Sequence, residues 1–352
     1  MAPDSRFWRH QLGEATTDLQ RSMLKPTLSL CLFFTLCSTN LEARTEPVRD
    51  TRSEISIPAG AMERPAHGES VMLASLPPTS VLFNTSPDGR WSNRIQIHIP
   101  NQPAVQRYIR FYNGEGRRTL TEALERSWPF VPVMSEILES YGVPAEMISV
   151  VLVESCFKRQ ASYRGAGGYW QMLAATARKN GLRVDRWVDE RRDPVKSTQA
   201  AARYLRSFYE EFNSWTLALA AYNAGSSPVE RAVRRWRAKD YWELSGRRCL
   251  PSKTRAYVPK VLAAMQIMRN LETHGFYRPR YPEVYSFDST PVRSPLRLDQ
   301  VARWLSVPLT DLRDLNPSLR QDCLPPDIAY DLRLPSGARE KFDMAYAEYL
   351  RR

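Results

Sequence analysis

The sequence predicts a mainly α protein, in which an all-helical domain is followed by a small C-terminal β-α-α-β module. Two observations predict this fold class. Apolar side chains recur at helical spacing from about residue 101 to about residue 273, and after Gly275 the pattern changes to short strand-like and helical segments. A chain of 352 residues is long enough for one sizeable core and a smaller second module.

Prolines and glycines divide the helical region. Apolar residues from Val105 to Tyr112 mark a first amphipathic helix. Pro144 suits the first turn of a helix that carries Glu154, and Gly181 terminates a later one. Further helices are predicted at residues 120–141, broken by Pro129 and Pro132, and at residues 174–180, 197–212, 215–224, 229–238 and 257–271. We expect a loop at residues 250–259 and, at residues 95–99, either a short strand or an extended lead-in.

The C-terminal module is predicted to contain strands at residues 281–287 and 329–334, with helices at residues 298–305 and 309–315 between them. Below ~70 residues a single core is marginal, so we expect the module to lean on the first domain or on a ligand. The predicted organisation is a signal region at 1–43, a flexible tether at 44–95, the helical domain at 96–278 and the module with its tail at 279–352.

The N-terminal region has the pattern of a secretory signal. Lys25 precedes a short apolar run at residues 26–37, and the small residue Ala43 precedes the expected mature start near residue 44. The run is too short to span a bilayer, and the tether that follows is rich in Pro, Ser, Thr and charge. We therefore expect an exported protein of the periplasm or cell envelope, associated with a membrane only through an N-terminal lipid or an uncleaved signal.

Composition and charge narrow the functional classes. With 43% hydrophobic and 25% charged residues, the chain as a whole is not disordered. The net charge of +12 indicates an acidic partner, either nucleic acid or another polyanion such as peptidoglycan, or else a solvated basic surface. The four histidines are scattered and no Cys/His spacing resembles a metal site, so we expect no metal or organic cofactor. A disulfide between Cys156 and Cys249 is expected in an oxidising compartment, with Cys323 left over.

Glu154 ends a run that is apolar on every side, residues 147–153. A helix of this kind is buried, and burial raises the pKa of a carboxyl, as a general acid working near neutral pH requires. For an isolated glutamate, a cap or an ion pair is the alternative role. Two further segments favour the catalytic role, namely residues 165–171 with the sequence Gly-Ala-Gly-Gly-Tyr-Trp-Gln and residues 220–225 with the sequence Ala-Ala-Tyr-Asn-Ala-Gly.

These segments resemble the motifs of the soluble lytic transglycosylases, glycoside hydrolase family 23. That family carries Glu-Ser, then Gly-Leu-Trp-Gln or Gly-Leu-Met-Gln, then Ala-Tyr-Asn. This chain carries Glu154-Ser155, Gly168-Tyr169-Trp170-Gln171 and Ala221-Tyr222-Asn223 in the same order. Residues 189–194, 200–205 and 257–260 resemble the D-type branch of the family. The resemblance covers residues from about 101 to 278 and implies a lysozyme-like catalytic domain.

The resemblance implies an enzyme that cleaves the β-1,4 bond between N-acetylmuramic acid and N-acetylglucosamine in peptidoglycan glycan strands. Glu154 is then the acid for the leaving oxygen and the base for the muramic C6 hydroxyl, which gives 1,6-anhydro ends. A retaining hydrolase needs a second carboxylate about 5 Å away. Asp185, Asp189, Glu190 and Asp193 fall in a helix-linking loop, so the sequence favours a single glutamate.

The resemblance also implies a set of substrate-binding residues. They are Ser155, Gly168, Trp170, Gln171, Tyr222 and Asn223. Tyr222 is expected to hydrogen-bond Glu154, with an ordinary half-buried aromatic as the alternative. Gln171 and Asn223 offer amide donors and acceptors for the sugar, although Asn223 alternatively caps its helix.

The other three residues have structural alternatives of their own. Ser155 either faces the muramyl subsite or bonds back into its helix. Trp170 either stacks on a sugar ring or lies in the core, and Gly168 lets the backbone approach a glycan. Cys156 departs from the family, which usually has glycine after Glu-Ser.

The C-terminal module resembles a LysM domain, a glycan-binding unit often attached to this family. The matching positions are Leu298, Val301-Ala302, Leu312 and Leu315-Asn316-Pro317, whereas Pro295-Leu296-Arg297 replaces the usual Gly-Asp-Thr. Sugar binding and buttressing of the catalytic domain both stay open for this module.

Three alternative functions remain beside the transglycosylase. A goose-type muramidase would deliver water in place of the C6 hydroxyl, and an inactive peptidoglycan-binding scaffold would not need Glu154. A cysteine peptidase would use Cys156 with His98 or His274 as its base. The leading interpretation predicts a monomer whose partner is the peptidoglycan glycan strand, with no nucleic acid.

Overall fold

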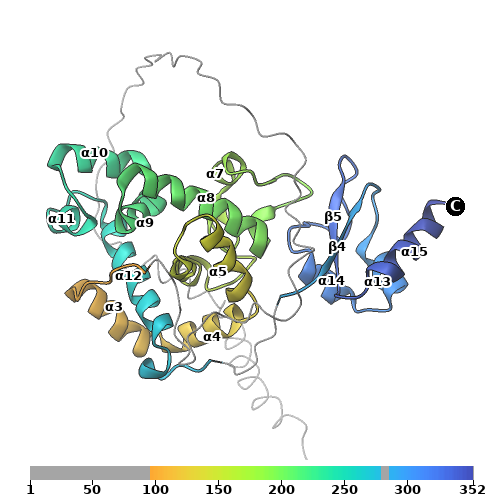
Figure 1. The fold of residues 1–352 in the computed structure, drawn as a ribbon, viewed down its shortest axis with the longest axis horizontal. Coiled ribbons are helices and arrows are strands. Elements are labelled where there is room, and N and C mark those ends of the chain that lie inside the picture. The colour runs from red at the N-terminus through yellow and green to blue at the C-terminus, as the bar shows by residue number, and fades with distance from the viewer. Residues whose placement is uncertain (1–95, 279–284, 352) are drawn as a thin grey trace, which may run out of the picture. The chain divides into compact units, whose positions relative to one another are not determined.

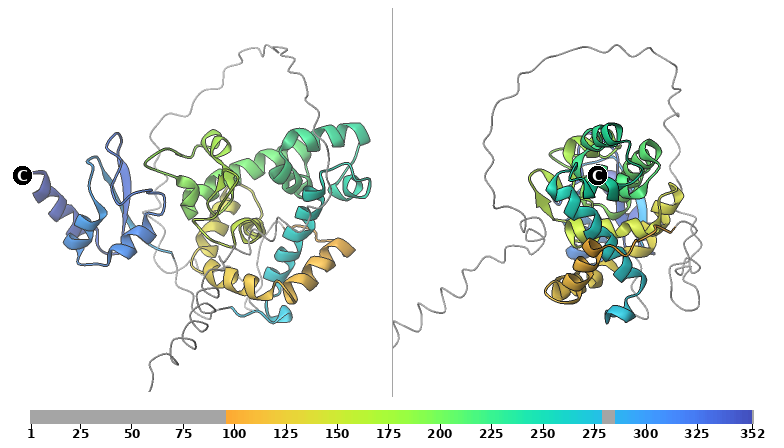
Figure 2. Two further views of the ribbon diagram at one scale, coloured as in Figure 1. Left: turned by 180° about the vertical axis from the view of Figure 1, so that it is seen from behind. Right: turned by 90° about the vertical axis from the view of Figure 1, so that its left-hand side faces the viewer.

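The computed structural model describes residues 96–278 and 285–351, and all of them fall within one compact unit. Figures 1 and 2 show the helices of the first domain and the strands and helices of the C-terminal module. The predicted signal region and the predicted tether, which together make up residues 1–95, lie outside the described residues. Within the described ranges, no helix combines the length and the apolar character needed to cross a membrane.

The first domain is helical, which confirms the predicted fold class. Its helices are α3 (Pro103–Asn113), α4 (Arg117–Ser127), α5 (Val131–Ser140), α6 (Ser149–Ser155), α7 (Ala174–Lys179), α8 (Pro194–Phe212), α9 (Trp215–Ala224), α10 (Ser226–Trp236), α11 (Tyr241–Gly246) and α12 (Ser252–Arg269). Short 3₁₀ turns are η2 (Ala145–Ile148), η3 (Glu190–Arg192) and η4 (Glu272–His274). Pro132 lies in the first turn of α5, which begins at Val131 after a break at residues 128–130, as the missing N–H of proline predicts.

Helix α12 runs through the centre of this domain and packs against α3, α6 and α9. Its side chains are buried over most of its length, since twelve of its residues lie in the core. Helix α9 presents Ala218, Ala220 and Ala221, all 0% exposed, and these small side chains let its neighbours α8 and α12 approach closely. The packing places the last turn of α6 beside the middle of α12.

The predicted loop at residues 250–259 is wrong, because α12 begins at Ser252 and contains Pro259. Proline removes one backbone donor, which leaves the carbonyl of Arg255, four residues earlier, without its helical partner. The hydroxyl of Tyr241 on α11 donates to that carbonyl at 2.7 Å. A side chain from another helix therefore stabilises α12 at Pro259, where the local sequence pattern predicted a break.

A small antiparallel sheet accompanies the helices and was not predicted. Its strands β1 (Ser162–Tyr163), β2 (Ala166–Gly167) and β3 (Met172–Leu173) pair in the order β1-β2-β3. Gly167 pairs with both Ser162 and Met172. Strands of two residues are too short to produce an alternating pattern. Residues 96–99 form no strand, which leaves the lead-in interpretation of this segment.

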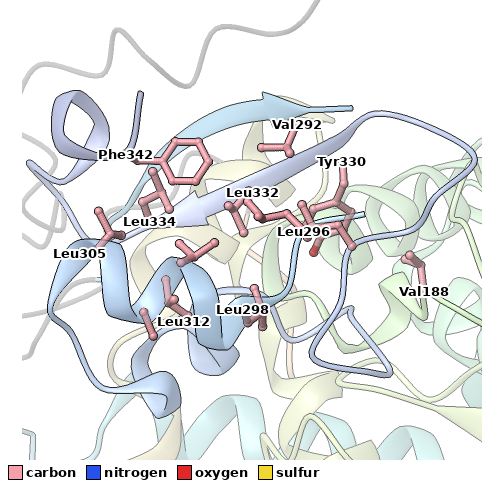
Figure 3. Close-up of a cluster of buried hydrophobic side chains, with 13 residues drawn as sticks. Val188, Val292, Leu296, Leu298, Leu305, Leu312, Tyr330, Leu332, Leu334 and Phe342 are labelled. Atoms are coloured by element: carbon pink, nitrogen blue, oxygen red, sulfur yellow. The ribbon is translucent and has the colours of Figure 1, made fainter. Parts of the chain in front are cut away.

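The C-terminal module contains β4 (Asp288–Val292), α13 (Leu298–Leu305), α14 (Leu309–Leu315), β5 (Tyr330–Leu334) and α15 (Arg339–Leu350). Strands β4 and β5 are antiparallel, from Asp288 opposite Leu334 to Val292 opposite Tyr330. The β-α-α-β order is confirmed. The first strand begins later than the predicted residues 281–287, of which 285–287 form no strand and 281–284 lie outside the description. Helix α15 was not predicted, and its Phe342 completes the core in Figure 3.

Candidate active site

Glu154 lies in the last turn of α6, which ends at Ser155. Val150, Val151 and Leu152 are at most 4% exposed, so the apolar run is buried as the sequence predicts. Cys156 ends the helix in the left-handed region, with φ 51°, a conformation that glycine adopts at little cost. This backbone requirement explains why glycine suits the position in the family. In this chain a buried thiol occupies it.

The environment of Glu154 raises the pKa of its carboxyl from 4.5 to about 7. Burial is the largest cause, although the residue as a whole keeps some exposed surface. A hydrogen bond from Tyr257 and the positive charge of Lys260 both oppose the rise. The Glu154 carboxyl is therefore protonated in about half of the molecules near neutral pH, which suits a group that first donates a proton and then accepts one.

Tyr257 and Lys260 lie on α12. They were not predicted as site residues from the sequence, where they appear only in the segment 257–260 that resembles the D-type branch of the family. The Tyr257 hydroxyl is buried and, among the described residues, has no other partner, while its contact with Glu154 falls short of ideal hydrogen-bond geometry. Burial and the charge of Glu154 raise the pKa of Tyr257, which keeps the phenol protonated as a donor. Lys260 is 9% exposed and lies over the ring of Tyr108 at 5.6 Å. The sequence signal that could have identified this pair is a lysine, Lys260, within a stretch of α12 that is buried from Tyr257 to Met265.

Tyr222 does not make the expected hydrogen bond to Glu154. Its hydroxyl instead donates to the backbone oxygen of Trp170 at 2.7 Å. Burial raises the pKa of Tyr222 and the nearby charge of Glu154 raises it further. Tyr222 thus lies close to the acid but links α9 to the loop that carries Trp170 and Gln171, while the hydroxyl that lowers the pKa of Glu154 is that of Tyr257.

Gly168, which the resemblance expects to lie near a glycan, is buried against Arg191. It has φ 75°, and a Cβ at this position would lie 1.8 Å from the backbone oxygen of Arg191. The neighbouring Gly167 packs against the guanidinium of Arg191. The glycines therefore admit a protein backbone and an arginine side chain at this face of the loop.

Two residues expected at the substrate lie in the core. The Trp170 ring is 1% exposed, and its Nε1 donates to Oγ1 of Thr198 at 2.9 Å, so it offers no face for stacking on a sugar. Ser155 is 0% exposed, and its hydroxyl bonds back to the Val151 oxygen at 3.1 Å. For both residues the structural alternative holds, because their side chains project from the buried side of their segments.

Gln171 and Asn223 are the predicted polar residues whose side chains remain accessible to solvent. Gln171 is half-buried, with φ 49°, and its Nε2 donates to the oxygens of Ala161 and Gly168 at 2.9 and 2.8 Å. Asn223 is exposed in the last turn of α9, where its Oδ1 accepts a bond from Thr254 Oγ1 at 3.0 Å. Gln171 is therefore fixed by its own loop, and its Oε1 has no hydrogen bond from any of the described residues.

The expected disulfide is wrong. Cys156 is buried at the end of α6, Cys249 and Cys323 are partly exposed, and none of the three is in a disulfide. The sequence interpretation rested only on both cysteines belonging to one domain, which does not bring their side chains together. The described residues also contain no group of three His, Cys, Asp or Glu side chains placed to hold a metal ion.

Two family models match the chain. Residues 133–245 match the transglycosylase SLT domain, and residues 286–350 match the LysM-like domain of lytic transglycosylase MltD. The first range contains Glu154 and the three sequence motifs, while Tyr257 and Lys260 lie beyond its end. The second range covers the module from before β4 through α15.

The chain is also similar to individual proteins. It is 29% identical over 253 residues to membrane-bound lytic murein transglycosylase D of Escherichia coli strain K12, over 68% of this chain and 54% of that protein. The chain thus spans about half the length of this relative. Among solved structures, an inactive variant of lytic transglycosylase Slt from Pseudomonas aeruginosa is 22% identical, with a TM-score of 0.36 over 44% of this chain and 25% of the other. The 70 kDa soluble lytic transglycosylase of Escherichia coli is 18% identical, with a TM-score of 0.38 over 50% of this chain and 32% of the other. The chain is thus similar to lytic transglycosylases in two separate segments, the SLT domain match at residues 133–245 and the MltD-type LysM-like match at residues 286–350.

Proposed function

We propose that the protein is a lytic transglycosylase that cleaves the β-1,4 bond between N-acetylmuramic acid and N-acetylglucosamine in peptidoglycan. The products end in 1,6-anhydro-N-acetylmuramic acid, and Glu154 is the sole acid and base. The observation that carries the proposal is a buried carboxyl with a pKa of about 7 inside the matched SLT domain. A location in the cell envelope follows from this substrate.

The reaction needs two proton transfers at one carboxyl. Protonated Glu154 first donates its proton to the glycosidic oxygen, and the bond between that oxygen and C1 of the muramic sugar breaks. The substrate's own N-acetyl oxygen stabilises C1 as the bond breaks. The resulting Glu154 carboxylate then removes the proton from the C6 hydroxyl, whose oxygen bonds to C1. The carboxyl is regenerated and no water is consumed.

The charges around Glu154 support a mechanism with one carboxylate. Besides burial, the influences on the pKa of the Glu154 carboxyl come from Tyr257 and Lys260, and neither of these is a carboxylate. A retaining hydrolase would need a second carboxylate about 5 Å away.

The loop carboxylates considered in the sequence are engaged in ion pairs. Asp185 pairs with Arg183, Asp189 with Arg191, Glu190 with Lys196, and Asp193 with Arg333. These contacts favour intramolecular ring closure.

Tyr257 and Gln171 have roles that follow from their contacts. Tyr257 stabilises the carboxylate form of Glu154 after the first proton transfer, because its hydroxyl is placed to donate to that group. Gln171, fixed through Nε2, presents Oε1 as an acceptor for a sugar hydroxyl or an N-acetyl N–H. Asn223 provides further polar surface at the end of α9.

The proposal is tested by digesting purified sacculi with the protein and with Glu154→Gln, followed by mass spectrometry of the soluble muropeptides. We expect products one water lighter than hydrolysed muropeptides, and none from the variant. Fully hydrated products would identify a muramidase instead. Binding to sacculi without any soluble product would identify a scaffold.

A further inference from the structure

The glycine-rich loop, residues 161–173, carries Gln171 and packs beside the residues around Glu154. We infer that Arg320 of the C-terminal module is a positioning residue for this loop, acting through Asp189 and Arg191. The inference rests on the proposed function, because it concerns how the same site holds its glycan. It assigns to the module a direct part in shaping the site of the other domain.

Arg191 stabilises the glycine-rich loop through hydrogen bonds to two of its backbone carbonyls. Nη1 of Arg191 donates to the oxygen of Gly165 at 2.8 Å and to the oxygen of Met172 at 3.0 Å. These carbonyls lie on either side of the segment from Gly168 to Gln171. The Tyr169 N–H donates back to the Arg191 oxygen at 3.3 Å. Arg191 is 9% exposed, so the loop conformation depends on where this buried guanidinium is held.

Asp189 holds Arg191 through a two-point contact. Its Oδ1 accepts from Nε at 2.8 Å and its Oδ2 accepts from Nη2 at 2.9 Å, a geometry that fixes the plane of the guanidinium. The same Oδ2 accepts from Nη2 of Arg320 in the module at 3.0 Å. Burial alone would raise the pKa of Asp189, but the hydrogen bond and charge of Arg191 together with the charge of Arg320 lower it. The Asp189 carboxylate thus forms ion pairs with both Arg191 and Arg320.

The backbone around this ion joins the two domains. The Asp189 N–H donates to the Ser318 oxygen at 2.7 Å, and the Arg320 N–H donates to the Trp187 oxygen at 2.9 Å. Val188, between them, is 1% exposed and belongs to the hydrophobic core of the module, where Figure 3 shows it near Tyr330. A residue of the first domain therefore completes the core of the second.

A second, deeper ion pair fixes the same junction. Arg333 on β5 pairs with Asp193 at 2.6 Å, and both side chains are less than 10% exposed. Asp193 also caps α8 by accepting from the N–H groups of Val195 and Lys196, both at 2.9 Å. Burial opposes the charge on Arg333, yet the charge of Asp193 raises its pKa above the ordinary value. The ion pair between Arg333 and Asp193 thus lies at the same junction as the contact between Arg320 and Asp189.

The test uses Arg320→Met in the full chain. The backbone bond from residue 320 to Trp187 is retained, so only the side-chain contact with Asp189 is removed. We expect amide hydrogen exchange in residues 161–173 to become about three- to tenfold faster, as the loss of one partly exposed charged hydrogen bond implies. We expect a similar loss of affinity for purified sacculi, seen in kinetics as a higher KM with kcat nearly unchanged, because the loop binds substrate and transition state alike.

Arg313→Met is the matched control, since Arg313 pairs with Asp322 within the module and does not reach the loop. Arg313→Met should change neither the amide exchange of residues 161–173 nor the affinity for sacculi. Arg320→Lys keeps a positive charge near Asp189, so its exchange and affinity should lie between those of Arg320→Met and those of the natural protein. Exchange in residues 161–173 that is equal in Arg320→Met and Arg313→Met would overturn the inference. So would faster exchange with unchanged sacculus affinity. Exchange and binding do not require cleavage, so a failure of the proposed activity would appear separately, as binding without product.

Discussion

Glu154→Gln should stabilise the protein at alkaline pH, although it removes the proposed catalytic group. Glutamine has the shape of a protonated glutamate and cannot ionise. In the native protein the carboxyl has a pKa of about 7, against 4.5 for an ordinary glutamate. The native state therefore binds this proton more tightly than the unfolded state does. The stability that this proton provides is present below about pH 4.5 and is lost as the pH rises through about 7.

The size of the effect follows from the two pKa values. Each pKa unit corresponds to about 1.4 kcal/mol, so the rise from 4.5 to about 7 corresponds to at most about 3–4 kcal/mol in the free energy of unfolding. Solvent that reaches the exposed part of the residue reduces this value. Glu154→Gln and the natural protein should be nearly equal in stability at about pH 4, and the variant should be more stable by roughly 2–3 kcal/mol at about pH 8.

Urea unfolding at several pH values, followed by tryptophan fluorescence, measures this difference. Glu115→Gln is the control for the change of glutamate to glutamine, because Glu115 is exposed on the turn between α3 and α4. A stability difference for Glu154→Gln that stays constant from acid to alkaline pH would refute the reasoning, since it would mean that the native environment does not disfavour the carboxylate.

Two further predictions concern the surroundings of Glu154. The pH dependence of kcat should fall on the alkaline side with a midpoint near 7, and Tyr257→Phe should move that midpoint to higher pH, since it removes a hydrogen bond that lowers the pKa of Glu154; an unchanged midpoint in initial-rate profiles would contradict the contact. Gly168→Ala should cost at least about 3 kcal/mol in urea unfolding, because a Cβ there meets the Arg191 backbone oxygen at 1.8 Å and φ is 75°. Gly225→Ala, with φ 83° and no atom within 4 Å of a Cβ, should cost less, about 1–2 kcal/mol from the backbone conformation alone, and equal costs would show that steric contact is not the cause.

The sequence predicted the features that depend on local patterns. The apolar run before Glu154 indicated a buried helix, and the structure buries Val150 and Val151 completely. Pro132 and Gly181 marked helix boundaries correctly. Pro259 did not, because the Tyr241 hydroxyl satisfies the carbonyl that proline leaves without a partner. That compensation comes from a residue on another helix, so no local pattern reveals it.

The arrangement of the site depended on contacts between distant positions. Asp189 and Arg320 are 131 residues apart in the sequence, and their contact could not be predicted from either segment alone. Trp170 and Gln171 are neighbours in one motif, yet one is buried and the other keeps surface, because the left-handed backbone of Gln171 turns the chain between them. A motif therefore identified the site, while only the fold separated its supporting residues from those that reach the surface.

The central claim is that a single carboxyl closes an anhydro ring without water, and the origin of the product oxygen tests it most directly. Sacculi are digested in water enriched with heavy oxygen, and the soluble muropeptides are weighed by mass spectrometry. The account predicts products that carry no solvent oxygen at the muramic C1 and that are absent from the Glu154→Gln digest. Heavy oxygen at that carbon from the first turnover would contradict it, because water rather than the C6 hydroxyl would then have attacked.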